Sequence, residues 1–292
     1  MTRETLLSVI ICTHQRPDHL ARCLGALAEL EDPVEVVVVD SASQPPVAET
    51  IARFADRLPS LVHLYETEPG LSLARNAGLR AATCELVAFV DDDAAPASDW
   101  ARRVVGGFVS SDVACVGGAC DPAFESPPPR WLSGRLLELA GVTRFGDRPF
   151  QATKTSEYPF GANIAFRKDL LLEVGGFDPS LGRIGASLLS GEETAVVSAL
   201  IARGHTVRIE PAARVAHTVT DERLKASYYW RRFFWQGVTR ARMGGRIRRG
   251  GGLVLEVPGY LTRWLRTRDR YYLYRASAET VGHLAEWTGL AR

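Results

Sequence analysis

Apolar residues follow two alternating patterns along residues 8–93. The first pattern is a continuous apolar run rich in β-branched residues, and it occurs at Ser8–Thr13, Val34–Asp40, Val62–Tyr65 and Glu85–Asp93. Such runs are typical of strands that are buried on both faces of a sheet. Between the runs, apolar residues recur every three or four positions, which is the spacing of a helix that packs one face on a sheet.

The segments between the runs predict three helices, over Pro17–Glu31, Val47–Leu58 and Ser72–Ala82. Proline suits the first turn of a helix, so Pro17 marks where the first of them begins. Strands that alternate with helices are typical of an α/β fold in which helices cover both faces of a parallel sheet.

Polar residues end three of the apolar runs: Thr13, Asp40 and Asp91–Asp93. Ligands bind α/β sheets beyond the carboxyl ends of the strands, so these side chains are predicted to line one crevice. Three adjacent carboxylates repel one another, and a divalent cation such as Mg²⁺ or Mn²⁺ that is bridged to phosphates would relieve the repulsion. The alternative is an acidic strand end or a helix N-cap, because Asp favours both positions.

The pattern is interrupted over residues 119–157, which contain three consecutive prolines and several Gly and Arg residues. This composition predicts a long irregular loop region, and long loops on compact domains commonly form lids or binding loops. Regular structure is predicted to resume at Asn163–Phe166 and to continue as a helix over Glu192–Arg203. Further strands are predicted up to about Val215.

Charge is distributed unevenly along the 292 residues, although the formal net charge is only +1. Residues 222–292 hold 15 Lys and Arg against 5 Asp and Glu, whereas residues 1–221 hold 20 against 29. We therefore predict an acidic catalytic domain over residues 1–220 and a basic, mainly helical C-terminal extension over residues 221–292.

Several functional classes are excluded by what the sequence lacks. The five cysteines form no CxxC pair or His-flanked cluster, so neither a disulfide framework nor a zinc site is expected. No glycine-rich dinucleotide-binding or Walker motif is present, which argues against a dehydrogenase or a P-loop NTPase. No signal-like start or long uncharged apolar run appears, so a cytoplasmic protein without a spanning helix is expected.

Six short motifs occur in an order that resembles the family 2 inverting glycosyltransferases of the GT-A fold. They are Ser8–Thr13, Val39–Ser41, Gly70–Gly78, Phe89–Asp93, Phe160–Lys168 with Gly175–Asp178, and Gly191–Thr194. The resemblance covers roughly residues 6–220. It implies a Rossmann-like mixed sheet, a nucleotide-diphosphate sugar donor and a divalent metal, Mn²⁺ or Mg²⁺. The acceptor would be a hydroxyl or amine of a small molecule or a glycan.

The resemblance also assigns roles to individual residues. The nucleotide-binding set is Thr13, Asp40, Arg75, Asp91 and Asp92, and the metal-binding set is Asp93, Asp91 and His217. In this family a carboxylate takes the proton of the acceptor, usually the Asp of a Glu-Asp pair. This chain has Glu192 and Glu193 at that place, so the resemblance makes Glu193 the base and Glu192 the second acid. Both would also suit the first turn of a helix because of its dipole.

Other assignments have structural alternatives as well. Asp40 would contact a base or ribose, or cap its own loop, and Arg75 would face a diphosphate or lie on the surface. His217 ends a late strand and is a metal ligand or a structural hydrogen-bonding group. Asn163 is assigned to the donor sugar or to neighbouring backbone, and Trp100 to sugar stacking or to the core.

Aromatic residues and arginines alternate over residues 228–249. One interpretation is a helix that packs partly on the catalytic domain while its arginines face water. The aromatic residues that would pack are Trp230, Phe233, Phe234 and Trp235. A second is peripheral contact with anionic lipid at the inner membrane face. Nucleic-acid binding is disfavoured because no nucleic-acid-binding motif is present. The basic extension would also suit contact with a partner subunit in a homo-oligomer.

Two alternative functions are less well supported by the same residues. A nucleotidyltransferase should carry a glycine- and lysine-rich phosphate loop near its N-terminus, and none is visible. A non-catalytic sugar-binding or scaffold protein on this fold would have no need of Asp91, Asp93 and Glu193, which are all present. We therefore predict a metal-dependent inverting glycosyltransferase.

Overall fold

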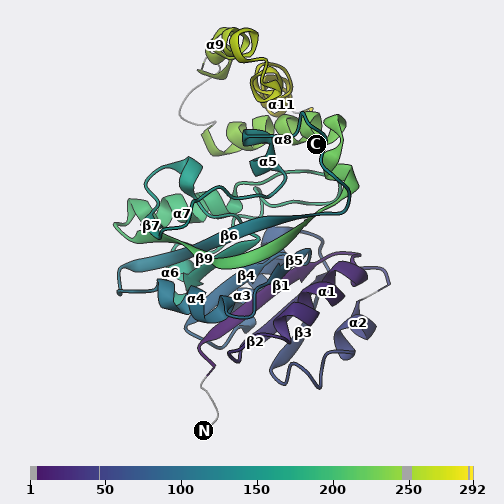
Figure 1. Cartoon of the computed structure of the whole chain (residues 1–292), viewed down its shortest axis with the longest axis vertical. Helices are drawn as coiled ribbons and strands as arrows, with labels where there is room; N and C mark the ends of the chain where they lie inside the picture. Colours follow the sequence, from purple (N-terminus) through teal and green to yellow (C-terminus); the bar gives the residue numbers. More distant parts are fainter. Residues whose placement is uncertain (1–4, 46, 245–251, 289, 292) are drawn as a thin grey trace. The chain divides into compact units, whose positions relative to one another are not determined.

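The computed structural model describes residues 5–45, 47–244, 252–288 and 290–291. The chain forms two compact units (Figure 1). Unit 1 comprises Met1–Ala123, Gly141–Pro179 and Glu192–Thr218, and unit 2 comprises Phe124–Ala140, Ser180–Gly191 and Val219–Arg292. The last boundary lies close to the division predicted at residue 220. The sequence did not predict that two internal segments, residues 124–140 and 180–191, belong with the C-terminal unit.

Four parallel strands form one side of the sheet of unit 1. They are β1 (Leu7–Thr13), β2 (Glu35–Ser41), β3 (Leu61–Glu66) and β4 (Leu86–Val90). Their order in space is β3-β2-β1-β4. This places the ends of β1 and β4 next to each other and puts Thr13 in register with Asp40 of β2. The predicted apolar runs are thus confirmed as neighbouring strands.

Antiparallel strands extend the sheet, so it is mixed, as the resemblance implied. The additional strands are β5 (Ala94–Pro96), β6 (Val113–Phe124), β7 (Phe150–Gln151), β8 (Asn163–Arg167) and β9 (Thr206–Val219). β8 pairs with β4 and β6, and β9 pairs with β5 and β7. The prediction of irregular structure from residue 119 is wrong for 119–124, because β6 continues through its two glycines to Phe124, with its residues buried as far as Cys120.

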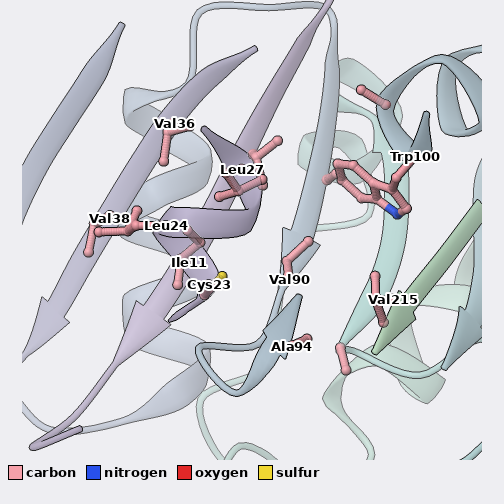
Figure 2. Close-up of a cluster of buried hydrophobic side chains, with 14 of the residues drawn as sticks. Ile11, Cys23, Leu24, Leu27, Val36, Val38, Val90, Ala94, Trp100 and Val215 are labelled. Carbon is pink, nitrogen blue, oxygen red and sulfur yellow. The ribbon is translucent and has the colours of Figure 1, made fainter. Parts of the chain in front are cut away.

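Helices cover both faces of this sheet, and the alternation of side chains along β1 separates two core layers. Val9 and Ile11 pack with α1 (Pro17–Leu27), α2 (Ala48–Ala52) and α4 (Trp100–Gly107), as Figure 2 shows in part. Ile10 belongs to the opposite layer, whose helices are α3 (Leu71–Ala81), α6 (Lys168–Glu173) and α7 (Glu192–Ala202). The helix predicted at Val47–Leu58 is real but shorter than expected.

Unit 2 is mainly helical. Its helices are α5 (Arg135–Leu139), α8 (Ala226–Gly244), α9 (Gly252–Thr267), α10 (Arg270–Tyr274) and α11 (Thr280–Trp287), with a π-helical turn at Arg275–Glu279. α8 and α11 approach closely at two glycines. A Cβ at Gly282 would lie 1.8 Å from the carbonyl oxygen of Phe234, and one at Gly237 would lie 1.9 Å from that of Glu279. Only glycine fits at such a crossing.

The aromatic residues of α8 form the core of unit 2. Tyr229 and Phe233 are fully buried, and their rings make edge contacts with Trp131 and Tyr271 at centroid distances of 5.4 and 5.5 Å. Phe233 is therefore buried as the packing interpretation expects, but its ring contacts are with residues of unit 2, and Trp230 remains 44% exposed. Residues 245–249 of the predicted segment lie outside the described residues. Among the described helices, none has the length and apolarity needed to cross a bilayer.

Candidate functional site

The three consecutive aspartates leave the sheet at the end of β4, beside the end of β1. Asp92 and Asp93 are buried, while Asp91 is partly exposed. The hydroxyl of Thr13 donates a hydrogen bond of 2.7 Å to Oδ2 of Asp92. The predicted crevice side chains Thr13 and Asp91–Asp93 are therefore brought together.

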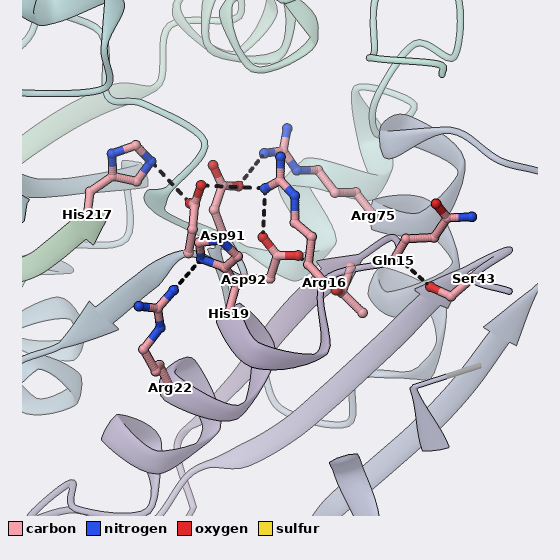
Figure 3. Close-up of polar contacts among 11 residues, drawn as sticks. Gln15, Arg16, His19, Arg22, Ser43, Arg75, Asp91, Asp92 and His217 are labelled. Carbon is pink, nitrogen blue, oxygen red and sulfur yellow. Dashed lines mark hydrogen bonds and ion pairs between the residues drawn. The ribbon is translucent and has the colours of Figure 1, made fainter. Parts of the chain in front are cut away.

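A histidine completes this cluster from a distant part of the sequence. β5 pairs antiparallel with β9, which places Ala94 opposite His217 and brings the imidazole to the aspartates (Figure 3). His217 Nε2 lies 3.2 Å from Oδ1 of Asp93. One ligand atom from each of Asp91, Asp93 and His217 lies within 4.8 Å of the others.

The donor set at this cluster suits a small divalent cation. Octahedral ligands about 2.1 Å from a metal stand about 3 Å apart, which is close to the separation of His217 Nε2 and Asp93 Oδ1. Carboxylate oxygens suit Mg²⁺ and Mn²⁺, and an imidazole nitrogen adds a preference for a transition ion such as Mn²⁺. The residues present therefore fit the predicted metal.

Burial makes the charge of these aspartates costly. It raises the pKa of Asp92 to about 6, and the negative charges of Asp93 and Asp91 act in the same direction. The guanidinium of Arg16 and the hydrogen bond from Thr13 oppose the shift. The buried aspartates therefore carry charge that their surroundings oppose, and a bound cation would relieve this cost.

Arg16 is a site residue that the sequence analysis missed. Its Nη1 lies 3.2 Å from Oδ1 of Asp92 and 3.5 Å from Oδ2 of Asp93 (Figure 3). Arg16 is the N-cap residue of α1, immediately before Pro17. The signal was a basic residue three positions after the strand-ending Thr13, in the turn that must cross the carboxyl edge of the sheet.

Asp40 has a structural role at the end of β2. Its side chain is fully buried, and its two oxygens accept hydrogen bonds from the backbone N–H groups of Ser43 and Val47 at 3.1 and 3.0 Å. This is the loop-capping alternative that the sequence left open. In this structure Asp40 shapes the loop after β2, and its carboxylate is covered.

Arg75 is buried, so the surface alternative is wrong. Its guanidinium donates to Oε1 of Glu192 at 2.7 Å and to Oδ1 of Asp91 at 3.5 Å. It also packs over the ring of Phe177, with the guanidinium carbon 5.3 Å from the centroid. A Cβ at Gly161 would lie 2.3 Å from Nη2, so this glycine makes room for the guanidinium.

The two glutamates that begin α7 occupy different environments. Glu192 is buried against Arg75, whereas Glu193 is only partly buried. Burial raises the pKa of Glu192 to about 7, the negative charge of Glu193 adds to the rise, and Arg75 opposes it. The structure thus gives Glu192 a fixed partner and leaves Glu193 the more accessible of the two acids. Both lie in the first turn of α7, where the helix dipole also favours them.

Comparison with known proteins decides the family. The family model described as glycosyl transferase family 2 matches residues 8–175, more than half of the chain. This chain belongs to glycosyl transferase family 2. It is a glycosyltransferase of the GT-A fold that uses a nucleotide-linked sugar donor.

Relatives within the family cover most of this glycosyltransferase. A glucosyl-dolichyl phosphate glucuronosyltransferase of Haloferax volcanii is 28% identical over 80% of this chain and 76% of its own length. The succinoglycan biosynthesis protein ExoM of Rhizobium meliloti is 27% identical over 83% of this chain and 77% of its own. Among solved structures, a mannosyltransferase of Pyrobaculum calidifontis in complex with GDP-Man and Mn²⁺ has a TM-score of 0.63 at 22% identity. That match covers 97% of this chain and 76% of the mannosyltransferase.

Two residues assigned to the sugar lie in the core of the glycosyltransferase. Trp100 is fully buried, and its indole N–H donates to Oδ1 of Asn163 at 2.9 Å. The amide nitrogen of Asn163 donates to the carbonyl oxygens of Ala119 and Ala213 at 2.9 and 2.8 Å. These bonds tie β8 to β6 and β9. The structure therefore replaces the predicted sugar contacts with the core and backbone roles that were their alternatives.

Proposed function

We propose that this glycosyltransferase is metal-dependent and inverting, and that it moves a sugar from a nucleotide-diphosphate donor to a hydroxyl or amine. The observation that carries the proposal is the group of Asp91, Asp93 and His217. These three side chains come from two distant segments, and their ligand atoms lie close enough together to hold one metal ion. The Mn²⁺ named with the Pyrobaculum mannosyltransferase, which shares the fold, supports the same conclusion.

In this proposal the aspartates prepare the donor end of the site. Asp93, Asp91 and His217 would hold Mn²⁺ or Mg²⁺, and the bound metal would supply stabilisation of the negative charge that develops on the leaving diphosphate. Thr13 fixes the orientation of Asp92 by its hydrogen bond. Asp40 holds the loop after β2 on the nucleotide side by capping its backbone.

The second half of the site would act on the acceptor. Glu193 accepts the proton of the attacking hydroxyl or amine, because it is the less buried of the two acids that begin α7. Glu192 is locked by Arg75, and the same guanidinium reaches Asp91. Arg75 thus holds Glu192 and Asp91 in one fixed arrangement, which suits a reaction that depends on positioning.

We also propose peripheral contact with an anionic membrane, through α9 rather than through the aromatic residues of α8. On α9, Leu261 and Leu265 are 39% and 58% exposed, and Arg263 and Arg266 are exposed beside them. No acidic residue occurs between Val257 and Arg268. Exposed leucines flanked by arginines suit a headgroup region that carries negative charge. A lipid-linked acceptor, as the name of the Haloferax relative indicates for that protein, would be met at such a surface.

Sedimentation with vesicles tests the membrane contact. Full-length protein should pellet with vesicles that contain phosphatidylglycerol, and Leu265→Glu should release it. Leu172→Glu, at a residue of unit 1 that is 48% exposed, is the matched control and should pellet like the wild type. Equal pelleting of the two variants would contradict the assignment to α9.

Donor turnover tests the function itself. UDP-, GDP- and TDP-sugars are incubated with the full chain, with Mn²⁺ or with EDTA, and the released nucleoside diphosphate is measured. We expect release from one nucleotide class, dependent on metal and increased by a hydroxyl acceptor. Release that continues at the same rate in EDTA would contradict the metal dependence.

A further inference from the structure

Arg16 occupies the carboxylates that the proposed metal needs. Each oxygen of Asp93 has a partner, because His217 lies at Oδ1 and Arg16 at Oδ2. Each oxygen of Asp92 also has one, Arg16 at Oδ1 and Thr13 at Oδ2. A single guanidinium thus spans the two most buried aspartates of the cluster. In this arrangement it supplies the positive charge that relieves their mutual repulsion.

A divalent cation and this guanidinium would compete for Asp93. Two cations that share one carboxylate repel each other, and the repulsion is strong where burial lowers the local dielectric. A metal at Asp93 would therefore weaken the hold of the carboxylates on Arg16. The released guanidinium would still lie beside the metal, where the proposed donor carries its diphosphate.

The exposure of the Arg16 side chain and the fixed position of its backbone would allow its guanidinium to exchange one anionic partner for another. Its side chain is 45% exposed, whereas that of Arg75, the other arginine that the structure describes against these aspartates, is 4% exposed and paired with Glu192. The backbone beneath Arg16 is held, since Gln15, with φ of +56°, donates its N–H to Ser43 Oγ at 2.8 Å (Figure 3). The long side chain of Arg16 can therefore change direction while its backbone stays in place. A guanidinium binds phosphate oxygens as well as carboxylates.

We propose that Arg16 is a ligand of the donor diphosphate that is held on Asp92 and Asp93 until a metal takes its place. The inference rests on the proposed function. It adds a partner exchange: in the metal-free protein Arg16 neutralises the aspartates, and in the loaded protein it neutralises the diphosphate. The same side chain then opposes binding of metal alone and favours binding of metal and nucleotide together.

Two binding measurements on the full chain separate this role from a structural one. Calorimetry gives the affinity for Mn²⁺ alone, and then for UDP, GDP and TDP at saturating Mn²⁺. The variants are Arg16→Met, which keeps the length and removes the charge, and Arg16→Lys, which keeps the charge. Arg22→Met is the matched control, since Arg22 is an exposed residue of the same helix whose guanidinium contacts His19.

The proposal predicts opposite changes in the two affinities of Arg16→Met. Binding of Mn²⁺ alone should tighten by about tenfold because a competing cation is gone. Binding of the nucleoside diphosphate with Mn²⁺ should weaken by about tenfold because a charge-assisted hydrogen bond is lost. Arg16→Lys should fall between the wild type and Arg16→Met in both measurements, and Arg22→Met should match the wild type.

The other outcomes overturn the inference in distinguishable ways. If the wild type binds metal and nucleotide but Arg16→Met weakens both or changes neither, Arg16 is structural and the proposed function stands. If the wild type binds neither Mn²⁺ nor any of the nucleotides, the proposed function fails, and the inference fails with it.

Discussion

Carboxylates are buried at both ends of the sheet in unit 1, but their hydrogen-bonding and ion-pair partners differ. At the amino end, Glu35 of β2 is buried and accepts hydrogen bonds from the hydroxyl of Ser8 and from both the backbone N–H and the hydroxyl of Thr83, the latter two at 2.8 and 2.9 Å. At the carboxyl end, Asp92 and Asp93 are buried side by side and share one partly exposed guanidinium.

The difference separates a carboxylate with a structural role, Glu35, from the two to which we assign a functional role, Asp92 and Asp93. Neutral donors surround Glu35, so its charge is solvated within the fold and ties β2 to its neighbours. The aspartates repel each other, and burial works against their charge. Burying two adjacent carboxylates is unfavourable for folding, and unfavourable local arrangements of this kind are expected mainly at functional sites. Substitutions at the two ends should therefore have opposite consequences.

The largest effect is expected at Asp93. Changing Asp93→Asn removes a charge from the predicted metal site, so metal-dependent donor turnover should fall about a thousandfold or more. The melting temperature of the metal-free protein should stay level or rise, because a repulsive charge is removed. A loss of turnover together with a large drop in melting temperature would show that Asp93, like Glu35, has a structural role.

The next largest effect is expected at Glu193. Changing Glu193→Gln removes the proposed base, so kcat should fall by about 10²–10⁴-fold. The affinity for nucleoside diphosphate, measured by calorimetry, should not change, since the donor end of the site is intact. Unchanged kcat would show that another group takes the proton of the acceptor.

At the amino end the effect should be on stability alone. Glu35→Ala leaves the donors of Ser8 and Thr83 without their acceptor, so the free energy of unfolding should fall by about 2–3 kcal/mol in urea denaturation. Nucleotide affinity of the folded protein should not change. Glu49→Ala, at an exposed glutamate of α2, is the control and should change neither quantity. A weakened nucleotide affinity in Glu35→Ala would contradict the purely structural role that we assign to Glu35.

The smallest effect is a pH dependence at Glu192. Its pKa is raised from 4.5 to about 7 in the folded protein, so the native state binds an extra proton between these values. The stability contributed by that proton is present below pH 4.5 and is lost as the pH rises through 7. From pH 5 to 8 the wild type should lose on the order of 1–3 kcal/mol more unfolding free energy than Glu192→Gln. Parallel pH profiles of the two proteins would contradict the raised pKa.

The sequence predicted the parts of this molecule that depend on local pattern. The runs that became β1, β2 and β4 were continuous and apolar, and their polar ends identified Thr13 and Asp91–Asp93. It could not predict contacts made by distant segments. The burial of Arg75 against Glu192 depends on how α3 and α7 pack, and the bond from Trp100 to Asn163 depends on where α4 meets β8.

The assignment of segments to unit 2 was likewise beyond the local pattern. Residues 124–140 were predicted to be an irregular loop because three consecutive prolines and Gly134 interrupt any regular spacing of apolar residues. In the structure Trp131 nevertheless packs on Tyr229, almost a hundred residues later in the sequence. Arg16 was missed because one arginine in a turn has no periodicity at all. The contact of Arg16 with the aspartates depends on the pairing of β1 with β4, which brings the turn after β1 next to them.

We propose above that Asp91, Asp93 and His217 form a metal site that binds the donor diphosphate. The most direct test is calorimetry of UDP, GDP and TDP binding to the wild type and to Asp93→Asn, with Mn²⁺ and with EDTA. We predict that one nucleotide binds the wild type at least about tenfold more tightly with Mn²⁺ than with EDTA, and that Asp93→Asn abolishes this difference. Nucleotide binding that is equally tight with Mn²⁺ and with EDTA, or a metal effect that survives in Asp93→Asn, would contradict it.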